Sequence, residues 1–372
     1  MNYLKKNNSY YNPVKIIETD NWINEIKLII ASKKLNSSLL ITSKGNNQRI
    51  NIQKYFPNLV IVDNVPPNPT IQYCDSELKS LRSQNFDSII AIGGGSVMDA
   101  AKLFLAGISI KEKSTIELIK YKKNIRTKVQ TFFIPTTHGT GSEVTMWGTI
   151  WDLENKKKYS ISNPDLYPNY ALLDYKLTES LSINLSIITL MDALSHSLES
   201  IWNKNKNSKT IKYAIEAIIL IINNTKDIHK KSISKENRKN LIYASTLAGL
   251  AFSNTKTAIC HSISYPLTML YNIPHGVASS MTLIPVLIQA ENEIKDELQI
   301  IYDELKINNL SDFICIIKEI YSNQISYKLK DWGVKKEDIP LLVKKCYTKD
   351  RIENYIIDIK EEDMLKILQT IY

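Results

Sequence analysis

The chain has 372 residues, of which 44% are hydrophobic and 23% are charged, as in an ordinary globular protein. This composition excludes a disordered chain, a collagen-like repeat and a small disulfide-stapled scaffold, and the length predicts two domains. The net charge of +9 rests mainly on lysine, since only five of the 47 basic residues are arginines. No dense basic run with interleaved aromatic residues occurs, so we expect no nucleic-acid partner.

Nothing in the sequence predicts export or membrane insertion. The first residues lack the apolar core of a secretory signal, and the longest apolar-rich run, around Ala214–Ile222, is shorter than the roughly 20 residues of a membrane span. The four cysteines lie far apart without a CxxC pair, which predicts scattered reduced thiols. We therefore expect a cytoplasmic protein with no membrane partner.

Short apolar runs alternate with helix-like segments through the first half of the chain. The runs lack polar alternation and are bounded by turn residues, as buried parallel strands are. They are residues 38–42, 59–62, 88–92, 131–134 and 170–173, with helix-like segments such as 71–84 and 97–104 and a possible hairpin of 144–151 with 159–161. This order predicts an α/β domain with a parallel sheet over residues 1–180.

Beyond about residue 181, strand-like runs give way to segments with apolar residues at helical spacing. These segments are residues 185–202, 209–222, 238–252, 277–293, 310–320 and 364–371. They predict an all-helical domain over residues 181–372. A ligand site is expected in the cleft between the two domains.

Five of the 11 glycines lie in two short loops, each directly after a predicted strand. In the first, three glycines at 93–95 precede Ser96, which is expected to cap the next helix. Such a loop predicts a pyrophosphate cradle, because glycines admit close approach and free N–H groups at a helix start face an anion. The second loop is residues 135–143, PTTHGTGSE. Together they predict one nucleotide crevice at the carboxyl edge of the sheet, with plain turns as the alternative.

Three of the five histidines, His196, His261 and His275, fall in the predicted helical domain, whereas His229 is expected at the surface. Asp192 lies four residues before His196, so both side chains project from one face of a helix. A carboxylate and an imidazole at this spacing can bind one metal ion, although the same pattern often has no function.

The spacing of the other two histidines allows them to join that pair. His261 and His275 are fourteen residues apart, and Pro266 and Pro274 are expected to break the helix so that His275 turns back toward His261. One carboxylate and three imidazoles suit a divalent first-row metal. The alternative is that these histidines are separate packed or exposed residues.

Four motifs resemble the iron-containing, group III metal-dependent alcohol dehydrogenase family: GGGSVMDAAK at 93–102, PTTHGTGSEVT at 135–145, MDALSHSLES at 191–200 and HSISYPLTMLYNIPHG at 261–276. The resemblance implies the dehydroquinate synthase-like fold, with a dinucleotide-binding α/β domain and an all-α domain, and it suggests a homodimer. It implies that Fe²⁺, with Zn²⁺ as the alternative, is bound by Asp192, His196, His261 and His275.

The resemblance also implies a set of contacts to NADH or NADPH. Carried over by motif, they are Asn68, Gly94, Gly95, Ser96, Asp99, Thr136, Thr137, Thr140 and Lys158. Ser43 stands where NAD-preferring members carry an aspartate that repels a 2′-phosphate. With Ser43 and the neighbouring Lys44 at this point, the sequence is compatible with NADH and with NADPH.

Two further departures from the family pattern concern the chemistry. Tyr265 stands where many members have a second histidine credited with proton relay, so Tyr265 and a water molecule are the candidate proton donors. His138 replaces a small residue in the second glycine loop, with a consequence that the sequence does not reveal.

Three stretches, residues 148–160, 198–205 and 252–268, resemble the branch of the family that reduces phosphonoacetaldehyde to 2-hydroxyethylphosphonate. The metal would polarise the carbonyl as a Lewis acid while NAD(P)H delivers hydride. An anionic aldehyde requires a cation in the pocket, for which Lys256 is the candidate. Sulfoacetaldehyde, a neutral aliphatic aldehyde, a related metal-dependent enzyme such as a glycerol dehydrogenase, and a non-catalytic nucleotide-binding protein are the alternatives.

Overall fold

The computed structural model describes residues 10–57, 59–226, 228, 233–321 and 325–372, so His229 lies outside the described residues. The chain forms two compact units. Of the described residues, one unit contains those in 12–137 and 142–179, and the other contains those in 180–372 with 138–141 and 10–11. The short segment 138–141 therefore packs with the helical unit, although it interrupts the α/β unit in sequence.

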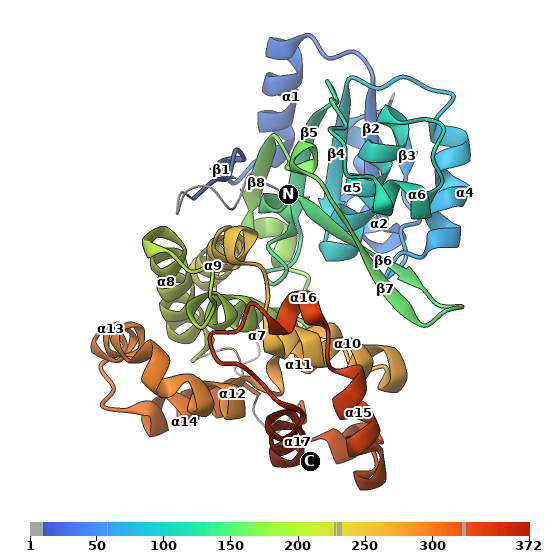
Figure 1. Cartoon of the computed structure of the whole chain (residues 1–372). Coiled ribbons are helices and arrows are strands. Elements are labelled where there is room, and N and C mark those ends of the chain that lie inside the picture. Colours follow the sequence, from blue (N-terminus) through green and yellow to red (C-terminus); the bar gives the residue numbers. More distant parts are fainter. Residues whose placement is uncertain (1–9, 58, 227, 229–232, 322–324) are drawn as a thin grey trace. The chain divides into compact units, whose positions relative to one another are not determined.

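A parallel six-stranded sheet forms the centre of the α/β unit (Figure 1). Its strand order is β1-β8-β5-β4-β2-β3. The strands are β1 (Lys15–Thr19), β2 (Ser38–Thr42), β3 (Val60–Val62), β4 (Ser88–Gly93), β5 (Gln130–Pro135) and β8 (Tyr170–Asp174). Five of the six match the predicted apolar runs, which confirms the parallel α/β sheet.

The central strands β2 and β4 are buried along their whole length because helices cover both faces of the sheet. Along β2, Leu39 and Ile41 belong to one core, whereas Leu40 between them belongs to the core on the opposite face. The helices of this unit are α1 (Trp22–Lys33), α2 (Lys44–Ile50), α3 (Ile52–Tyr55), α4 (Ile71–Leu81), α5 (Gly95–Ser109) and α6 (Thr115–Lys120). Residues of α4 and α5 pack in the first core and residues of α1 in the second.

Strand β1, at the edge of the sheet, was not predicted. Its residues KIIET contain a single apolar pair, and β8 is its one neighbour among the strands that the structure describes. An edge strand with partly exposed side chains does not require the long apolar run of a central strand. The predicted hairpin is present as β6 (Trp147–Asp152) and β7 (Lys157–Ser162), which pair antiparallel.

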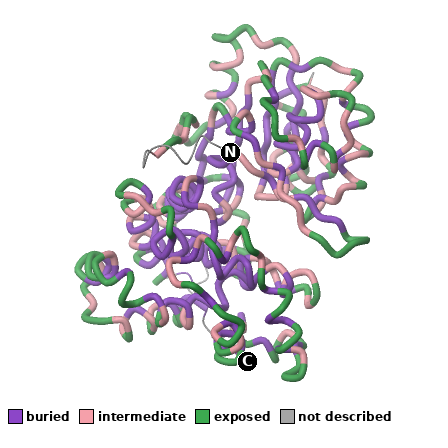
Figure 2. The backbone as a smooth tube through the Cα atoms, viewed as in Figure 1, coloured by how far each residue is buried: buried purple, intermediate pink, exposed green. Residues whose placement is uncertain are grey.

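The second unit is helical, as expected. Its helices are α7 (Ile183–Ile201), α8 (Ser208–Thr225), α9 (Lys235–Thr255), α10 (Ile259–Tyr271), α11 (His275–Ser280), α12 (Leu283–Ala290), α13 (Lys295–Leu305), α14 (Leu310–Tyr321), α15 (Ile339–Lys345), α16 (Lys349–Ile352) and α17 (Glu361–Thr370). Every residue of α7 from Leu190 to Ile201 is buried, and the buried stretches concentrate on the central helices (Figure 2). None of the helices described is long and apolar enough to cross a membrane.

Two details of the helix prediction are wrong. Residues 277–293 do not form one helix, because α11 ends at Ser280 and α12 begins at Leu283. Pro266 does not break a helix but lies inside α10, where burial of the surrounding side chains outweighs the lost backbone hydrogen bond. The chain turns instead at Asn272, whose left-handed conformation ends α10. The four cysteines are free thiols, as predicted.

Candidate metal and dinucleotide sites

Helix α7 places three acidic or imidazole side chains on one face. Asp192, His196 and Glu199 follow at intervals of four and three residues, so they project in the same direction from the helix. All three residues are buried. Buried ionisable groups need partners, and these come from α10 and α11.

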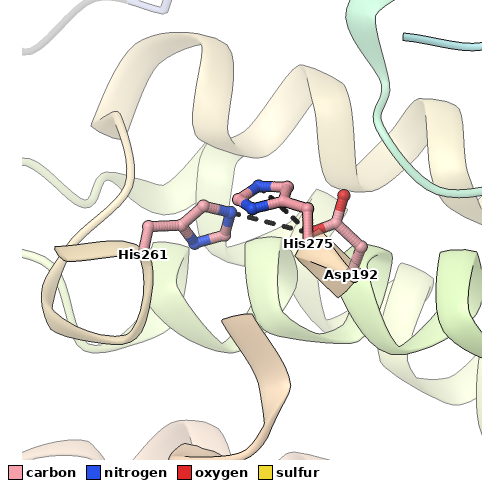
Figure 3. A group of neighbouring side chains, drawn as sticks. All are labelled: Asp192, His261 and His275. Carbon is pink, nitrogen blue, oxygen red and sulfur yellow. Dashed lines mark ion pairs between the residues drawn. The ribbon is translucent and has the colours of Figure 1, made fainter. Parts of the chain in front are cut away.

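Asp192, His261 and His275 converge on one point (Figure 3). Asp192 Oδ1 lies 3.7 Å from His261 Nε2 and 3.9 Å from His275 Nε2. One possible ligand atom from each residue lies within 4.8 Å of the others. The turn at Asn272 thus brings His275 back toward His261, as the sequence predicted, although not through Pro266.

The donor set fits a divalent first-row metal ion. Ligands at 2.0–2.2 Å from one ion in tetrahedral geometry lie roughly 3.5 Å apart, close to the observed separations. His261 Nε2 is buried without a hydrogen-bond partner, which a metal would supply. Ser279 Oγ donates to Asp192 Oδ1 at 2.9 Å and fixes the carboxylate. Burial alone would raise the pKa of Asp192, but the nearby histidines hold this pKa well below its usual range.

His196, the fourth predicted ligand, lies beside this group. Its ring stacks between Phe252 at 4.1 Å and His261 at 4.6 Å, measured between ring centroids. Its Nδ1 is 4.0 Å from Asp192 Oδ2 and has no hydrogen-bond partner. Burial lowers the pKa of His196 to about 4, so the ring is neutral and able to donate a lone pair.

Glu199 is a residue of this site that the sequence analysis missed. Its Oε2 accepts from His261 Nδ1 at 2.6 Å, and its two oxygens also accept the backbone N–H groups of Ala258 and His261. Burial alone would lower the pKa of His261, but Glu199 and Asp192 raise it to about 9. Glu199 could have been predicted from the sequence, because it follows Asp192 by two helical turns and therefore lies on the same face of α7. A carboxylate that accepts from Nδ1 turns Nε2 toward the metal position.

We expect Glu199→Gln to weaken metal binding. Glutamine lacks the charge that holds His261 in this tautomer, and removal of such a carboxylate costs about 10- to 100-fold in metal affinity. Zn²⁺ titration of the metal-free protein against a chromophoric chelator measures this affinity. Glu297→Gln is the control, because Glu297 pairs with Lys206 at 2.5 Å away from these ligands. Equal affinity in Glu199→Gln and wild type would contradict this role.

Tyr265 lies next to the histidines, as its sequence position suggested. Its ring is 6.4 Å from the ring of His275, with an angle of 17° between their planes. The Tyr265 hydroxyl accepts a hydrogen bond from Arg351 Nε at 3.0 Å. Arg351 belongs to α16 and was not predicted as a site residue.

Lys256, the predicted anion-binding residue, is held through its main chain at the end of α9. Its carbonyl accepts from Asn203 Nδ2 at 3.1 Å and from Thr255 Oγ1 at 3.0 Å. Its backbone has φ 65° and ψ 174°, a conformation that only glycine adopts readily. Strain of this kind persists where surrounding contacts fix the chain, here just before the helix that carries His261.

The second glycine loop packs against helices of the helical unit. A Cβ atom on Gly139 would lie 2.5 Å from the carbonyl oxygen of Thr189 in α7. Gly141 has φ +56°, and a Cβ atom there would lie 2.5 Å from Gly249 Cα in α9. Close packing therefore requires both glycines whatever ligand binds. Thr140 between them is partly exposed.

His138, the departure from the family pattern, is fully buried in this loop. Its Nδ1 lies 3.3 Å from Thr189 Oγ1, and burial lowers its pKa to about 4. An unfolded histidine has a pKa near 6.5, so between pH 6.5 and 4 the unfolded chain binds a proton that the folded chain does not. This group therefore lowers stability as the pH falls through that window.

We expect the His138 contribution to be about 2 kcal/mol lost between pH 7 and pH 5. Urea unfolding of wild type and His138→Asn at both pH values measures it. The variant should lose less stability than wild type on acidification, because asparagine does not titrate. An identical pH dependence in the two proteins would show that His138 is not held neutral.

In the α/β unit, the order of the strands defines a candidate nucleotide site. From β2 the chain moves outward to β3, whereas from β4 it moves the opposite way to β5 and β8. The neighbours β2 and β4 therefore flank the point at which the topology reverses. Open α/β sheets bind ligands beyond the carboxyl ends of the strands at such a point. The loops there begin at Ser43 and Gly94.

Backbone groups of the first glycine loop are available for an anion. Gly94 precedes α5 and provides no side-chain cap, and Gly95 is the first residue of that helix. The prediction that Ser96 caps α5 is wrong, because its Oγ accepts the backbone N–H of Asn68 at 3.1 Å. The N-terminus of α5 has no side-chain cap, so its free backbone N–H groups can still bind a phosphate. Asn68 and Ser96, both predicted cofactor contacts, are thus brought together.

Other predicted cofactor residues gather near this loop. The Thr136 N–H donates to the Gly93 carbonyl at 3.1 Å, and a Cβ atom on Gly94 would lie 3.3 Å from Thr137 Cγ2. Ser43 caps α2 by accepting the Asn46 N–H at 3.4 Å.

Asp99 is linked through Ser142 to a buried lysine, Lys102, that was not predicted as a site residue. Lys102 Nζ donates to Ser142 O and Oγ and to the Thr145 hydroxyl at 2.7–2.9 Å, and Ser142 Oγ donates to Asp99 at 3.1 Å. Burial lowers the pKa of Lys102 to about 8, and Asp99 opposes this change. Burial raises the pKa of Asp99, and the charges of Lys102 and of Lys158 on β7 oppose this change. The Nζ of Lys158 is 5.4 Å from the centroid of the Trp151 ring.

Comparison with known proteins gives matches over nearly the whole chain. Residues 13–175 match the family model described as iron-containing alcohol dehydrogenase, and residues 186–372 match the model of the C-terminal part of that family. An NADPH-dependent butanol dehydrogenase of Clostridium saccharobutylicum is 30% identical over 84% of this chain and 83% of its own. A 1,3-propanediol dehydrogenase of Citrobacter freundii is 30% identical over 76% of this chain and 73% of its own.

A solved structure has the same fold. The sulfoacetaldehyde reductase of Bifidobacterium kashiwanohense, determined in complex with NAD⁺, superposes with a TM-score of 0.90 over 98% of each chain at 24% identity. Identity at this level supports the shared fold and not a shared substrate.

Proposed function

Because the chain belongs to the iron-containing alcohol dehydrogenase family, we propose that it reduces a short anionic aldehyde to a primary alcohol with NADH or NADPH. Phosphonoacetaldehyde, giving 2-hydroxyethylphosphonate, is the leading substrate. The convergence of Asp192, His261 and His275 around the unpartnered Nε2 of His261 carries the proposal. Reduction of sulfoacetaldehyde or of a neutral aliphatic aldehyde is the alternative.

The residues of the candidate metal site have two roles, to bind the metal ion and to orient its ligands. Asp192, His261 and His275, with His196 beside them, would hold Fe²⁺ or Zn²⁺, and Glu199 orients His261. A bound ion supplies Lewis-acid polarisation of the aldehyde carbonyl, worth several kcal/mol of charge stabilisation.

The remaining tasks are to position the cofactor and to supply a proton. Anchoring the pyrophosphate at the loop beginning at Gly94 would fix the nicotinamide for hydride transfer to the carbonyl carbon. Tyr265 is our candidate proton donor, because a hydroxyl that accepts from the Arg351 cation can still donate its own proton.

The anionic substrate rests on the resemblance of residues 148–160, 198–205 and 252–268 to phosphonoacetaldehyde reductases. The named activities of the relatives include both charged and neutral compounds, so a test must compare the two kinds. The same relatives are named with NADPH and with NAD⁺, and Ser43 with the exposed Lys44 is compatible with either.

An aldehyde panel tests the proposal. Metal-free protein is reconstituted with Fe²⁺ or Zn²⁺ and assayed by nicotinamide absorbance with NADH and NADPH against phosphonoacetaldehyde, sulfoacetaldehyde and propionaldehyde. We expect metal-dependent turnover, with kcat/KM for phosphonoacetaldehyde at least about tenfold above propionaldehyde. A preference for propionaldehyde would contradict the anionic substrate. Metal and cofactor binding without turnover would indicate the non-catalytic alternative. We also propose a homodimer, which light scattering in solution tests.

A further inference from the structure

Arg351 places a positive charge beside the metal group. Its Nε donates to the Tyr265 hydroxyl at 3.0 Å, and its guanidinium carbon lies 5.8 Å from the centroid of that ring. The same ring stacks on His275 at 6.4 Å. The Tyr265 side chain therefore neighbours both the arginine and a predicted metal ligand.

Two carboxylates, those of Glu199 and Asp350, lie close enough to Arg351 to favour its positive charge, but neither bonds to it within the described part of the chain. Arg351 forms no ion pair there, and its recorded side-chain partner is the neutral Tyr265 hydroxyl. Glu199 is already bound to His261 and to two backbone N–H groups. No carboxylate among the described residues bonds to the terminal nitrogens of Arg351, so these nitrogens can donate to an anionic ligand.

The choice of residue matters as well as its charge. The chain uses lysine for nearly all its basic positions and has only five arginines. Arginine differs from lysine in presenting a planar fork of donors that matches two oxygens of a phosphonate, sulfonate or carboxylate. With Nε occupied by Tyr265, the two terminal nitrogens form the remaining fork.

We propose that Arg351, positioned by Tyr265, binds the acidic head group of the aldehyde whose carbonyl lies at Asp192, His261 and His275. This inference rests on the proposed function and adds a specificity residue to it. The fork and the metal group would contact opposite ends of one small molecule. An acidic aldehyde would supply an anion to the guanidinium, whereas a neutral aldehyde would not. Arg351 thus replaces Lys256 as our candidate for substrate charge.

The test compares charged and neutral substrates in four variants of the metal-loaded enzyme. The ratio of kcat/KM for phosphonoacetaldehyde to that for propionaldehyde is measured in wild type, Arg351→Met, Arg351→Lys, Lys256→Met and Lys349→Met. Lys349 is the matched control, because it lies on α16 with an 81% exposed side chain. We expect Arg351→Met to lower the ratio about 100-fold, mainly through KM, and Lys349→Met to leave it unchanged. Arg351→Lys should retain part of the preference for phosphonoacetaldehyde, because lysine keeps the positive charge but lacks the planar fork.

A second readout does not depend on turnover. Calorimetric titration with 2-hydroxyethylphosphonate should show a Kd about 100-fold weaker in Arg351→Met than in Lys349→Met, with thermal melting confirming that both are folded. If wild type prefers the anionic aldehyde and Arg351→Met keeps both the ratio and the Kd, the role of Arg351 is overturned and the proposed function stands. A loss with Lys256→Met in its place would return the role to Lys256. If wild type prefers propionaldehyde, the anionic substrate itself fails.

Discussion

Substitution of Asp192 by alanine should leave the chain unable to retain a metal ion and should lower kcat/KM by about a thousand-fold or more. Asp192 is the residue that the three histidines share, with oxygen–nitrogen distances of 3.7–4.0 Å to His196, His261 and His275. Without it the predicted ligands are imidazoles alone, and no negatively charged group would bind the divalent cation directly. A thousand-fold loss corresponds to about 4 kcal/mol, within the several kcal/mol that Lewis-acid catalysis contributes.

Metal analysis and kinetics test this expectation together. Metal content is measured after reconstitution with Fe²⁺ and dialysis, and kcat/KM is measured with the preferred aldehyde. Asp303→Ala is the control, because Asp303 is exposed on α13 and accepts a hydrogen bond from Gln299. It should bind metal and turn over as wild type does. Full metal content with full activity in Asp192→Ala would refute the metal role of this carboxylate.

Local patterns in the sequence predicted much of the fold. Uninterrupted apolar runs located the central strands because both faces of β2 and β4 are covered. The edge strand β1 was not predicted, because a partly exposed strand does not need an uninterrupted apolar run. Strand order could not be predicted, since it depends on pairings distant in sequence. The reversal between β2 and β4, which marks the candidate nucleotide site, therefore emerged only from the structure.

The residues of the candidate metal site likewise include some that local spacing predicts and others that only the structure reveals. The spacing of Asp192 and His196 is local and was readable, and Glu199 could have been added as the next residue on that helix face. The contact between Tyr265 and Arg351 joins residues 86 positions apart in the chain. The spacing of residues along a helix or strand cannot predict such a contact. A sequence search for a cation near His261 accordingly selected Lys256, which is close along the chain.

Gly276→Ala should be the most disruptive of the glycine substitutions near the metal group. A Cβ atom at this position would lie 2.1 Å from the Ile188 carbonyl oxygen of α7, far inside contact distance. The obstacle is backbone, so α11 must move away from α7. We expect a loss of about 3 kcal/mol in the free energy of unfolding, the upper part of the usual range for overpacking. Urea unfolding measures this loss.

The same movement should weaken metal binding, because His275 precedes Gly276 directly and Asp192 lies one helical turn after Ile188. Separating α11 from α7 would lengthen the 3.9 Å distance between His275 Nε2 and Asp192 Oδ1. Two controls separate this effect from general destabilisation. Gly107→Ala meets Leu78 in the α/β unit and should lower stability without changing Zn²⁺ affinity, whereas Gly45→Ala meets nothing within 4 Å and should do neither. If Gly276→Ala matched Gly107→Ala in Zn²⁺ affinity, the close approach of α11 to α7 would serve packing alone.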